Sequence, residues 1–267
     1  MKTILCPTDF SKSADKTSRY AAQLAKDTNA KIILAATPTK KSKVLAGDWP
    51  DETDHLYEIH DLLKANYQIP CGIEEEVVND NVYKKLSKIA DRYDLMIFGM
   101  QFGSEGLPRH SAGIDLIKII QETLAPLLIV PEKFEYKKIN RLLYAYDYQH
   151  EPEPPLLVLQ WLADWFNVEL RFISIYQDDI STEEERHIDL IENKIANQWK
   201  SKQKLSFESI QFENVPMCLE HYLNLWSPND LLILSVNHQN MLQKLWHKSV
   251  VKCLLASATH PYLIIHK

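Results

Sequence analysis

The sequence predicts an α/β protein made of two tandem domains, each with a doubly wound, five-stranded parallel sheet. Two observations carry this prediction. Segments of the first half recur in the second half in the same order, which indicates an internal repeat. Short, uninterrupted apolar segments also alternate with amphipathic helical patterns along both halves, as in parallel sheets whose two faces are covered by helices.

The repeat rests on three pairs of matching segments at nearly one spacing. An apolar run, an aspartate and an aromatic residue occur in this order in Lys2–Phe10 (KTILCPTDF) and in Asn140–Tyr148 (NRLLYAYDY). Asp9 thereby corresponds to Asp147, at an offset of 138 residues. The other pairs, at offsets of 136 and 135 residues, are Asp94–Met100 with Asp230–Val236 and Ala125–Lys133 with His260–Lys267.

The repeat divides the chain into domains of residues 1–134 and 135–267, joined near Glu132–Lys138. In the first domain, Ser11 is the expected N-cap of the first helix, because a serine oxygen there accepts a backbone N–H. A second helix is expected to bury Leu56, Ile59, Leu62 and Leu63, which share one helical face. The remaining patterns predict helices at 82–93 and 116–123, and strands at 4–6, 31–37, 73–79, 95–98 and 126–131.

The second domain follows the same order of elements. Prolines 154 and 155 open its first helix, where a missing N–H has no cost. Thr182 and Glu185 have the spacing of a capping box at the start of the next helix. Further patterns predict a helix at 215–226 and strands at 142–146, 168–176, 205–212, 230–236 and 261–266.

Composition narrows the function classes. The 267 residues are 45% hydrophobic and 25% charged, which is typical of globular rather than disordered chains. The net charge of −6 without a basic aromatic-rich cluster argues against nucleic-acid binding. No apolar segment reaches the ~18 residues of a membrane span, and the N-terminus lacks a signal-peptide pattern, so we expect a cytoplasmic protein and no membrane partner.

The positions of the cysteines and histidines indicate reduced thiols and no metal site. The four cysteines are far apart and form no C-x-x-C pair, so buried, reduced thiols are expected at Cys6, Cys71, Cys218 and Cys253. The ten histidines show no metal-ligand spacing with cysteine or carboxylate residues. We therefore expect no structural metal.

A glycine-rich segment follows the fourth predicted strand. Residues 98–115 read FGMQFGSEGLPRHSAGID, with four glycines between a strand and a helix. Ligands of doubly wound sheets bind beyond the carboxyl ends of the strands, where the strand order reverses. Asp9 and this loop are both expected at that edge.

These residues make the chain resemble the universal stress protein family in its tandem form. The resemblance is carried by Ile4–Ser11 (ILCPTDFS), Asp94–Met100 with its glycine loop, Ala125–Pro131 and their second-half counterparts, and spans essentially the whole chain. It implies a Rossmann-like, adenine-nucleotide α-hydrolase-like fold in each half. It also implies that the two domains pair through their last strands as a pseudo-twofold dimer.

The resemblance further implies where a nucleotide would bind. Family members that bind ATP use an Asp after the first strand, backbone at the end of the second strand, and a loop G-x₂-G-x₉-G-[ST] after the fourth. Asp9 and Asp147 match that Asp, and Ala36 matches the end of the second strand. The alternative is that each aspartate stabilises the first turn of the following helix by ~0.3–1 kcal/mol. Both roles stay open for Asp9, and the helix role is favoured for Asp147.

The first glycine loop matches the motif in part. Gly103 and Gly113 have the x₉ spacing, while Gly99, the best match for the first glycine, lies one residue too far from Gly103. Ile114 stands where the motif has Ser or Thr. Glycines allow the backbone to approach a phosphate and to reach positive φ, so this loop keeps the backbone requirement and loses the hydroxyl.

The second loop shows the opposite pattern. Its spacing is intact, but Ser235, His238 and Lys248 replace the three glycines, and only Ser249 remains. The side chains of His238 and Lys248 would occupy the space that a phosphate needs.

The leading hypothesis is a non-catalytic universal stress protein, a stress-response or regulatory module with weak or absent ATP binding. One alternative is a switch that binds ATP or AMP through the first half alone. Another is an interaction scaffold with a protein partner of unknown identity; a homodimer also stays open. No nucleophile–base pair or paired carboxylates indicate an enzyme.

Overall fold

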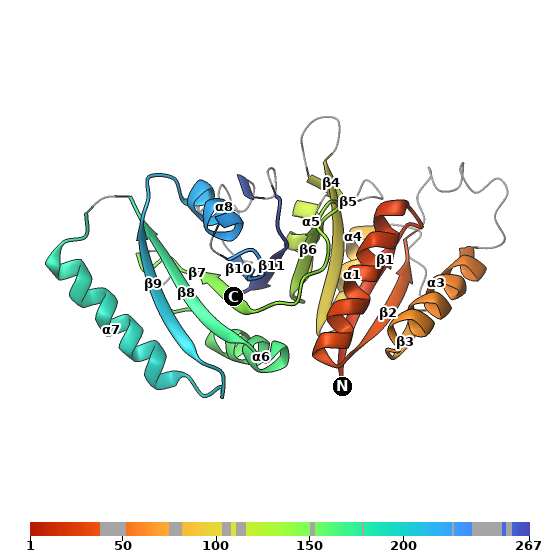
Figure 1. Ribbon diagram of the computed structural model, residues 1–267, viewed down its shortest axis with the longest axis horizontal. Coiled ribbons are helices and arrows are strands. Elements are labelled where there is room, and N and C mark those ends of the chain that lie inside the picture. Colours follow the sequence, from red (N-terminus) through yellow and green to blue (C-terminus); the bar gives the residue numbers. More distant parts are fainter. Residues whose placement is uncertain are drawn as a thin grey trace. The chain divides into compact units, whose positions relative to one another are not determined.

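The computed structural model describes residues 1–37, 52–74, 82–102, 108–110, 116–149, 153–177, 179–225, 227–236, 253–254 and 258–267 (Figure 1). By their internal contacts these residues form two units. The first unit is Met1–Tyr136 with Leu263–Ile265, and the second is Lys137–Tyr262 with His266–Lys267. Both units alternate strands and helices, which confirms the predicted α/β class.

The first unit contains five parallel strands in the doubly wound order β3-β2-β1-β4-β6. The chain order reverses between β1 and β4, so the edge expected to hold ligands lies at their carboxyl ends. The strand bounds are Lys2–Thr8 for β1, Ala30–Ala36 for β2, Cys71–Glu74 for β3, Leu95–Phe102 for β4 and Leu127–Pro131 for β6.

Helices cover this sheet on both faces (Figure 1). Ser11 is the N-cap of α1 as predicted, accepting the N–H of Ala14 at 3.1 Å. Leu62 was expected on the buried face of α3, but this residue is 59% exposed. Leu56, Ile59 and Leu63 are buried, as predicted. The bounds are Lys12–Thr28 for α1, Glu52–Tyr67 for α3, Val82–Ala90 for α4 and Leu116–Glu122 for α5.

The fourth strand is longer than the sequence predicted. We expected a strand to Phe98 and then a loop, but β4 continues to Phe102 and pairs Gly99 with Val130 of β6. A short strand, β5 (Pro108–His110), then pairs antiparallel with the end of β4. Part of the predicted glycine loop is therefore a β-hairpin.

The second unit repeats the order of the first. Its strands β10-β7-β8-β9 are parallel and correspond to β4-β1-β2-β3. The strand bounds are Arg141–Ala145 for β7, Glu169–Tyr176 for β8, Leu205–Gln211 for β9 and Leu231–Val236 for β10. The last strand of the chain, β11 (Tyr262–His266), has its central residues Leu263–Ile265 in the first unit.

The helices bounded within the described residues of this unit are α6 (Leu156–Phe166), α7 (Thr182–Gln198) and α8 (Val215–Leu225). Helix α6 begins after Pro155, as the paired prolines predicted. The capping box of α7 lies one residue earlier than predicted. Ser181 and Glu184 form it, rather than Thr182 and Glu185.

The cysteines follow the expected burial only in part. Cys6 and Cys218 are buried and all four thiols are free, but Cys253 is exposed. Burial raises the pKa of Cys6 to about 12, so this thiol remains protonated and unreactive at neutral pH.

Candidate functional site

The ligand edge of the first unit begins with a tightly bonded turn after β1. The N–H of Phe10 donates to Thr8 Oγ1 at 3.1 Å, and the N–H of Ser11 donates to Asp9 Oδ1 at 3.1 Å. The N–H of Ala14 donates to Ser11 Oγ. These N–H groups at the start of α1 therefore have acceptors within the chain, although such groups are what a helix N-terminus offers to an anion.

Phe10 is held in an unusual backbone conformation in this turn. Its φ is 63°, in the left-handed region, which costs a bulky residue on the order of 1 kcal/mol. Its ring lies 5.1 Å from the ring of His55 in α3. Strained residues that surrounding contacts hold in place cluster at functional sites, and Phe10 lies at the point where the strand order reverses.

The end of the second strand closes onto the same turn. Ala36 is the last residue of β2 and pairs with Thr8. The next residue, Thr37, donates both its N–H (2.8 Å) and its hydroxyl (3.1 Å) to the Thr8 carbonyl. The topology thus brings Asp9 and Ala36 to one edge, as the sequence predicted.

Gly99 lies within the sheet, where its lack of a side chain has a packing reason. A Cβ at this position would lie 2.2 Å from Thr17 Oγ1 of α1 and 3.3 Å from Thr17 Cβ. Glycine at this position lets α1 pack closely against β4. Gly103 and Gly113 lie outside the residues that the structure describes.

The second unit repeats the turn of the first. The N–H of Gln149 donates to Asp147 Oδ1 at 3.0 Å, as Ser11 does to Asp9. The hydroxyl of Ser174, beyond the paired ends of β7 and β8, donates to the Tyr146 carbonyl at 2.7 Å, the counterpart of the contact between Thr37 and Thr8. The duplication seen in the sequence therefore extends to individual hydrogen bonds.

Of the second glycine loop, only Ser235 lies in the described part of the chain. It is buried in β10, and its Oγ accepts the Tyr144 hydroxyl at 2.9 Å. It therefore takes part in packing between neighbouring strands. His238, Lys248 and Ser249 fall outside the described residues.

A cavity of about 320 Å³ opens at the ligand edge of the second unit. It lies at the carboxyl ends of β7 and β8 and reaches the first turns of α7. Its lining includes Tyr146, Asp147, Tyr148, Ser174, Tyr176 and His187. We did not predict Tyr176 or His187 from the sequence, because strand register and helix placement bring them beside Asp147.

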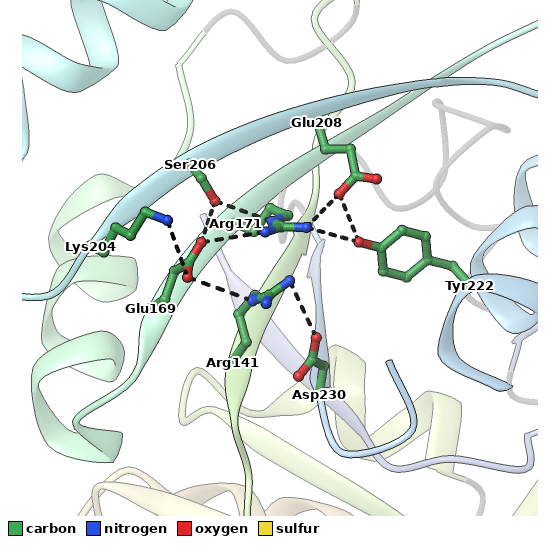
Figure 2. Close-up of polar contacts among 8 residues, drawn as sticks. All are labelled: Arg141, Glu169, Arg171, Lys204, Ser206, Glu208, Tyr222 and Asp230. Carbon is green, nitrogen blue, oxygen red and sulfur yellow. Dashed lines mark hydrogen bonds and ion pairs between the residues drawn. The ribbon is translucent and has the colours of Figure 1, made fainter. Parts of the chain in front are cut away.

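The second unit also carries a network of charged side chains on the sheet face next to α8 (Figure 2). Arg171 of β8 is its centre, with ion pairs to Glu208 of β9 at 2.7 Å and to Glu169 at 3.6 Å. Tyr222 of α8 donates its hydroxyl to the same Glu208 carboxylate at 2.7 Å. The other members drawn are Arg141, Lys204, Ser206 and Asp230.

The charges of this network balance. Three cations, Arg141, Arg171 and Lys204, face three carboxylates, Glu169, Glu208 and Asp230. At the matching register position the first unit has Ile33, since Leu5 pairs with Ile33 as Leu143 pairs with Arg171. Arg171 therefore stands where the first unit has an apolar side chain, and the balanced network leaves no net charge for a ligand. The alternation of polar residues in ELRF and LSFES is the signal in the sequence that indicates such a half-exposed face.

The described residues show neither a metal cluster nor a membrane-spanning helix. They contain no group of three or more His, Cys, Asp or Glu side chains that would hold a metal ion. No helix among them is both long and apolar enough to cross a membrane.

The fold and this ligand edge define a doubly wound α/β protein with two repeated units. Residues 1–131 match the model of the universal stress protein family. The chain belongs to this family by a match over its first half, which confirms the resemblance. No curated protein sequence matches the chain significantly.

Solved structures extend the likeness over both halves. A universal stress protein from Archaeoglobus fulgidus DSM 4304 has a TM-score of 0.69 at 14% identity, covering 99% of this chain and 98% of that one. A protein assigned to the same family from Pseudomonas aeruginosa UCBPP-PA14 has a TM-score of 0.61 at 13% identity, covering 100% and 93%. The cytoplasmic domain of a prokaryotic cation chloride cotransporter follows with a TM-score of 0.55 at 10% identity, covering 98% and 94%. At these identities the likeness shows the fold, not the function.

Proposed function

We propose that the protein is a non-catalytic regulatory module of the stress response, in which ATP binding through the family's glycine loops is weak or absent. One observation carries this proposal. Gly99, the first glycine of the only loop that keeps its glycines, is a member of β4 and has Thr17 against it. The close packing of α1 against β4 therefore accounts for the glycine at position 99.

The two aspartates support the same function. Asp9 is 6% exposed, and both Asp9 and Asp147 accept an N–H from the residue two positions on. Such contacts stabilise the turn that starts the following helix. These contacts support a structural role for Asp9 and Asp147, which the family resemblance would instead place in contact with adenosine.

The sequence supplies the rest of the support. Ile114 removes the hydroxyl donor from the first loop, and His238 and Lys248 place side chains in the second. No nucleophile–base pair was found at either edge among the described residues. A regulatory role through conformation or partner binding fits these features better than a role in ATP turnover.

We also propose that the two halves pair through their last strands, β6 and β11. All five residues of β6 are buried, as are Tyr262, Leu263, Ile264 and Ile265 of β11. An uncovered edge strand would expose its backbone and invite aggregation. The burial of both strands supports pairing.

The experiment that tests the proposed function is a thermal shift with and without Mg-ATP, combined with mass spectrometry of the purified protein. We expect no co-purified nucleotide, no shift in millimolar ATP and no hydrolysis above background. Binding at 100 times Kd would add about 2.7 kcal/mol of stability, so a real site is easily seen. Bound ATP or AMP would instead favour the switch function in the first half.

A further inference from the structure

The cavity of the second unit differs in charge from a nucleotide site. Its volume of about 320 Å³ lies within the range of small-molecule sites, roughly 300–1,000 Å³. Three carboxylate residues line it, Asp147, Asp179 and Glu184, and the described lining contains no Lys or Arg. A phosphate placed there would meet charge of its own sign, whereas a cation would be attracted.

We propose that this cavity binds a small organic ammonium compound, a protonated amine carried on an apolar or aromatic body. The proposal goes beyond the regulatory function above and does not depend on it. ATP binding concerns the glycine loops, and the ammonium site concerns the ends of β7 and β8.

Two hydroxyls and the carboxylates of the lining favour a ligand that brings donors. The Tyr148 hydroxyl donates to Glu192 Oε1 at 2.7 Å, and the Ser174 hydroxyl donates to the Tyr146 carbonyl at 2.7 Å. Because each hydroxyl has one hydrogen, both oxygens retain only acceptor capacity. Carboxylates likewise only accept when ionised. An ammonium group supplies N–H donors to this set, and a phosphate does not.

The carboxylates of the rim are anchored rather than mobile. Glu184 accepts from the Ser181 N–H at 2.9 Å in the capping box, and Asp179 accepts from Gln211 Nε2 at 2.9 Å. The Ser181 hydrogen bonds lower the pKa of Glu184. The acceptors are thus held in place before a ligand arrives, which reduces the entropy lost on binding.

Apolar and aromatic groups complete the cavity. Ile175, Ile180, Ile188 and Val215 line it together with the tyrosines. Tyrosine faces attract cations by about 0.5–2 kcal/mol, according to how far the cation is desolvated. The apolar residues would contact the body of the ligand, and the carboxylates its ammonium group.

The first unit provides a matched comparison. At the offset of 138 residues, Tyr146, Asp147 and Tyr148 correspond to Thr8, Asp9 and Phe10. The aspartate and its turn are repeated, but the two tyrosines are not. Asp9 is therefore the control for Asp147, since both accept the same type of backbone N–H.

The test is calorimetric titration of the full chain with three probes that share a body and differ in charge: phenethylammonium, 2-phenylethanol and 3-phenylpropanoate. We expect saturable binding of the ammonium, at least about tenfold weaker binding of the alcohol, and the weakest binding of the carboxylate. Asp147→Asn should weaken ammonium binding about tenfold, because it removes a charged acceptor while keeping Oδ1 for Gln149. Asp9→Asn should leave it unchanged.

Three results would overturn the proposal. These are equal affinities for the ammonium and the alcohol, no saturable ammonium binding up to about 10 mM, or an Asp147→Asn variant that binds as tightly as the unaltered protein. If Asp147→Asn fails to fold, as judged by circular dichroism, the charge series on the unaltered chain still decides. Isothermal titration with Mg-ATP is run separately, so failure here leaves the regulatory function to its own test.

Discussion

At the scale of single residues, a substitution at Gly99 tests whether this glycine is needed for packing rather than for phosphate binding. Gly99→Ala places a Cβ 2.2 Å from Thr17 Oγ1, so α1 or β4 must shift. We expect a loss of about 1–3 kcal/mol in the free energy of unfolding, measured with urea, as for other overpacked cores. The cause is local, and the loss is independent of any ligand.

The double variant Gly99→Ala, Thr17→Ala is the control for this prediction. It removes the hydroxyl oxygen and leaves Thr17 Cβ at 3.3 Å, a distance that a small shift accommodates. We expect the double variant to recover part of the stability lost by Gly99→Ala, relative to Thr17→Ala alone. Additive effects of the two substitutions would show that they do not meet, and would refute the packing role.

The repeated residues Asp94 and Asp230 should change the stability of the fold in opposite directions as the pH falls. Burial acts to raise the pKa of Asp94, but hydrogen bonds from the Thr3 N–H, Lys2 and the Thr3 hydroxyl outweigh it and lower the pKa below 3.8. Burial raises the pKa of Asp230 above 3.8, despite the hydrogen bond from Ser227 and the nearby Arg141.

The signs follow from proton binding. Folded Asp94 binds fewer protons than unfolded Asp94, so its contribution is lost as pH falls below about 4. Folded Asp230 binds more protons, so its contribution is lost as pH rises through its raised pKa. Urea unfolding from pH 3 to pH 7 should show that Asp94→Asn costs more stability at the upper end and Asp230→Asn more at the lower end. Parallel pH profiles for the two variants would contradict these pKa directions.

At the scale of elements, the helices and strands were predictable because their signals are local. Period and capping placed Ser11 before α1 and the prolines before α6. The continuation of β4 and the presence of β5 were not predictable, because glycine and proline indicate a turn locally. Pairing of Gly99 with Val130 and of Phe102 with Pro108 overrides that signal.

The candidate site, like the fold, was predictable only in part. Topology placed Asp9 at the sheet edge, and the family resemblance added Ala36 and Asp147. It missed the cavity, since Tyr176 and His187 approach Asp147 only through the register of β8 and the placement of α7.

The capping box of α7 gives an element-scale prediction with an internal control. Ser181 accepts the Glu184 N–H at 3.3 Å, and Glu184 accepts from the Ser181 N–H at 2.9 Å. Ser181→Ala should cost about 1 kcal/mol in unfolding free energy, because it leaves a helix N–H without its partner. Thr182→Ala, at the position predicted from the sequence, should change stability by less than about 0.5 kcal/mol. Reversed sizes would restore the original assignment.

The charged network predicts that Arg171 contributes to stability through its partners. Arg171→Met leaves Glu208 with only Tyr222 of the contacts in Figure 2. The Arg171 side chain is 23% exposed, so the expected loss of about 1–3 kcal/mol is less than for a fully buried pair. Lys204→Met is the control, since Lys204 is 72% exposed and 3.9 Å from Glu169, and should be nearly neutral. An unchanged midpoint in urea for Arg171→Met would show that the network has no net effect.

At the scale of the whole molecule, duplication has kept the fold and allowed the two edges to diverge. The turns at Asp9 and Asp147 have the same hydrogen bond. The first edge keeps glycines, and the second has tyrosines and a cavity instead. Neither edge retains the full phosphate motif, and the proposed regulatory function rests on this loss.

Isothermal titration of the full chain with Mg-ATP tests whether the glycine loops bind a nucleotide. We predict no saturable heat in the micromolar to millimolar range, for the unaltered protein and for Gly113→Val alike. Equal results for the two proteins would mean that the glycine loop binds no nucleotide. Tight, Mg-dependent binding that Gly113→Val abolishes would contradict the proposed function and establish the first half as an ATP site.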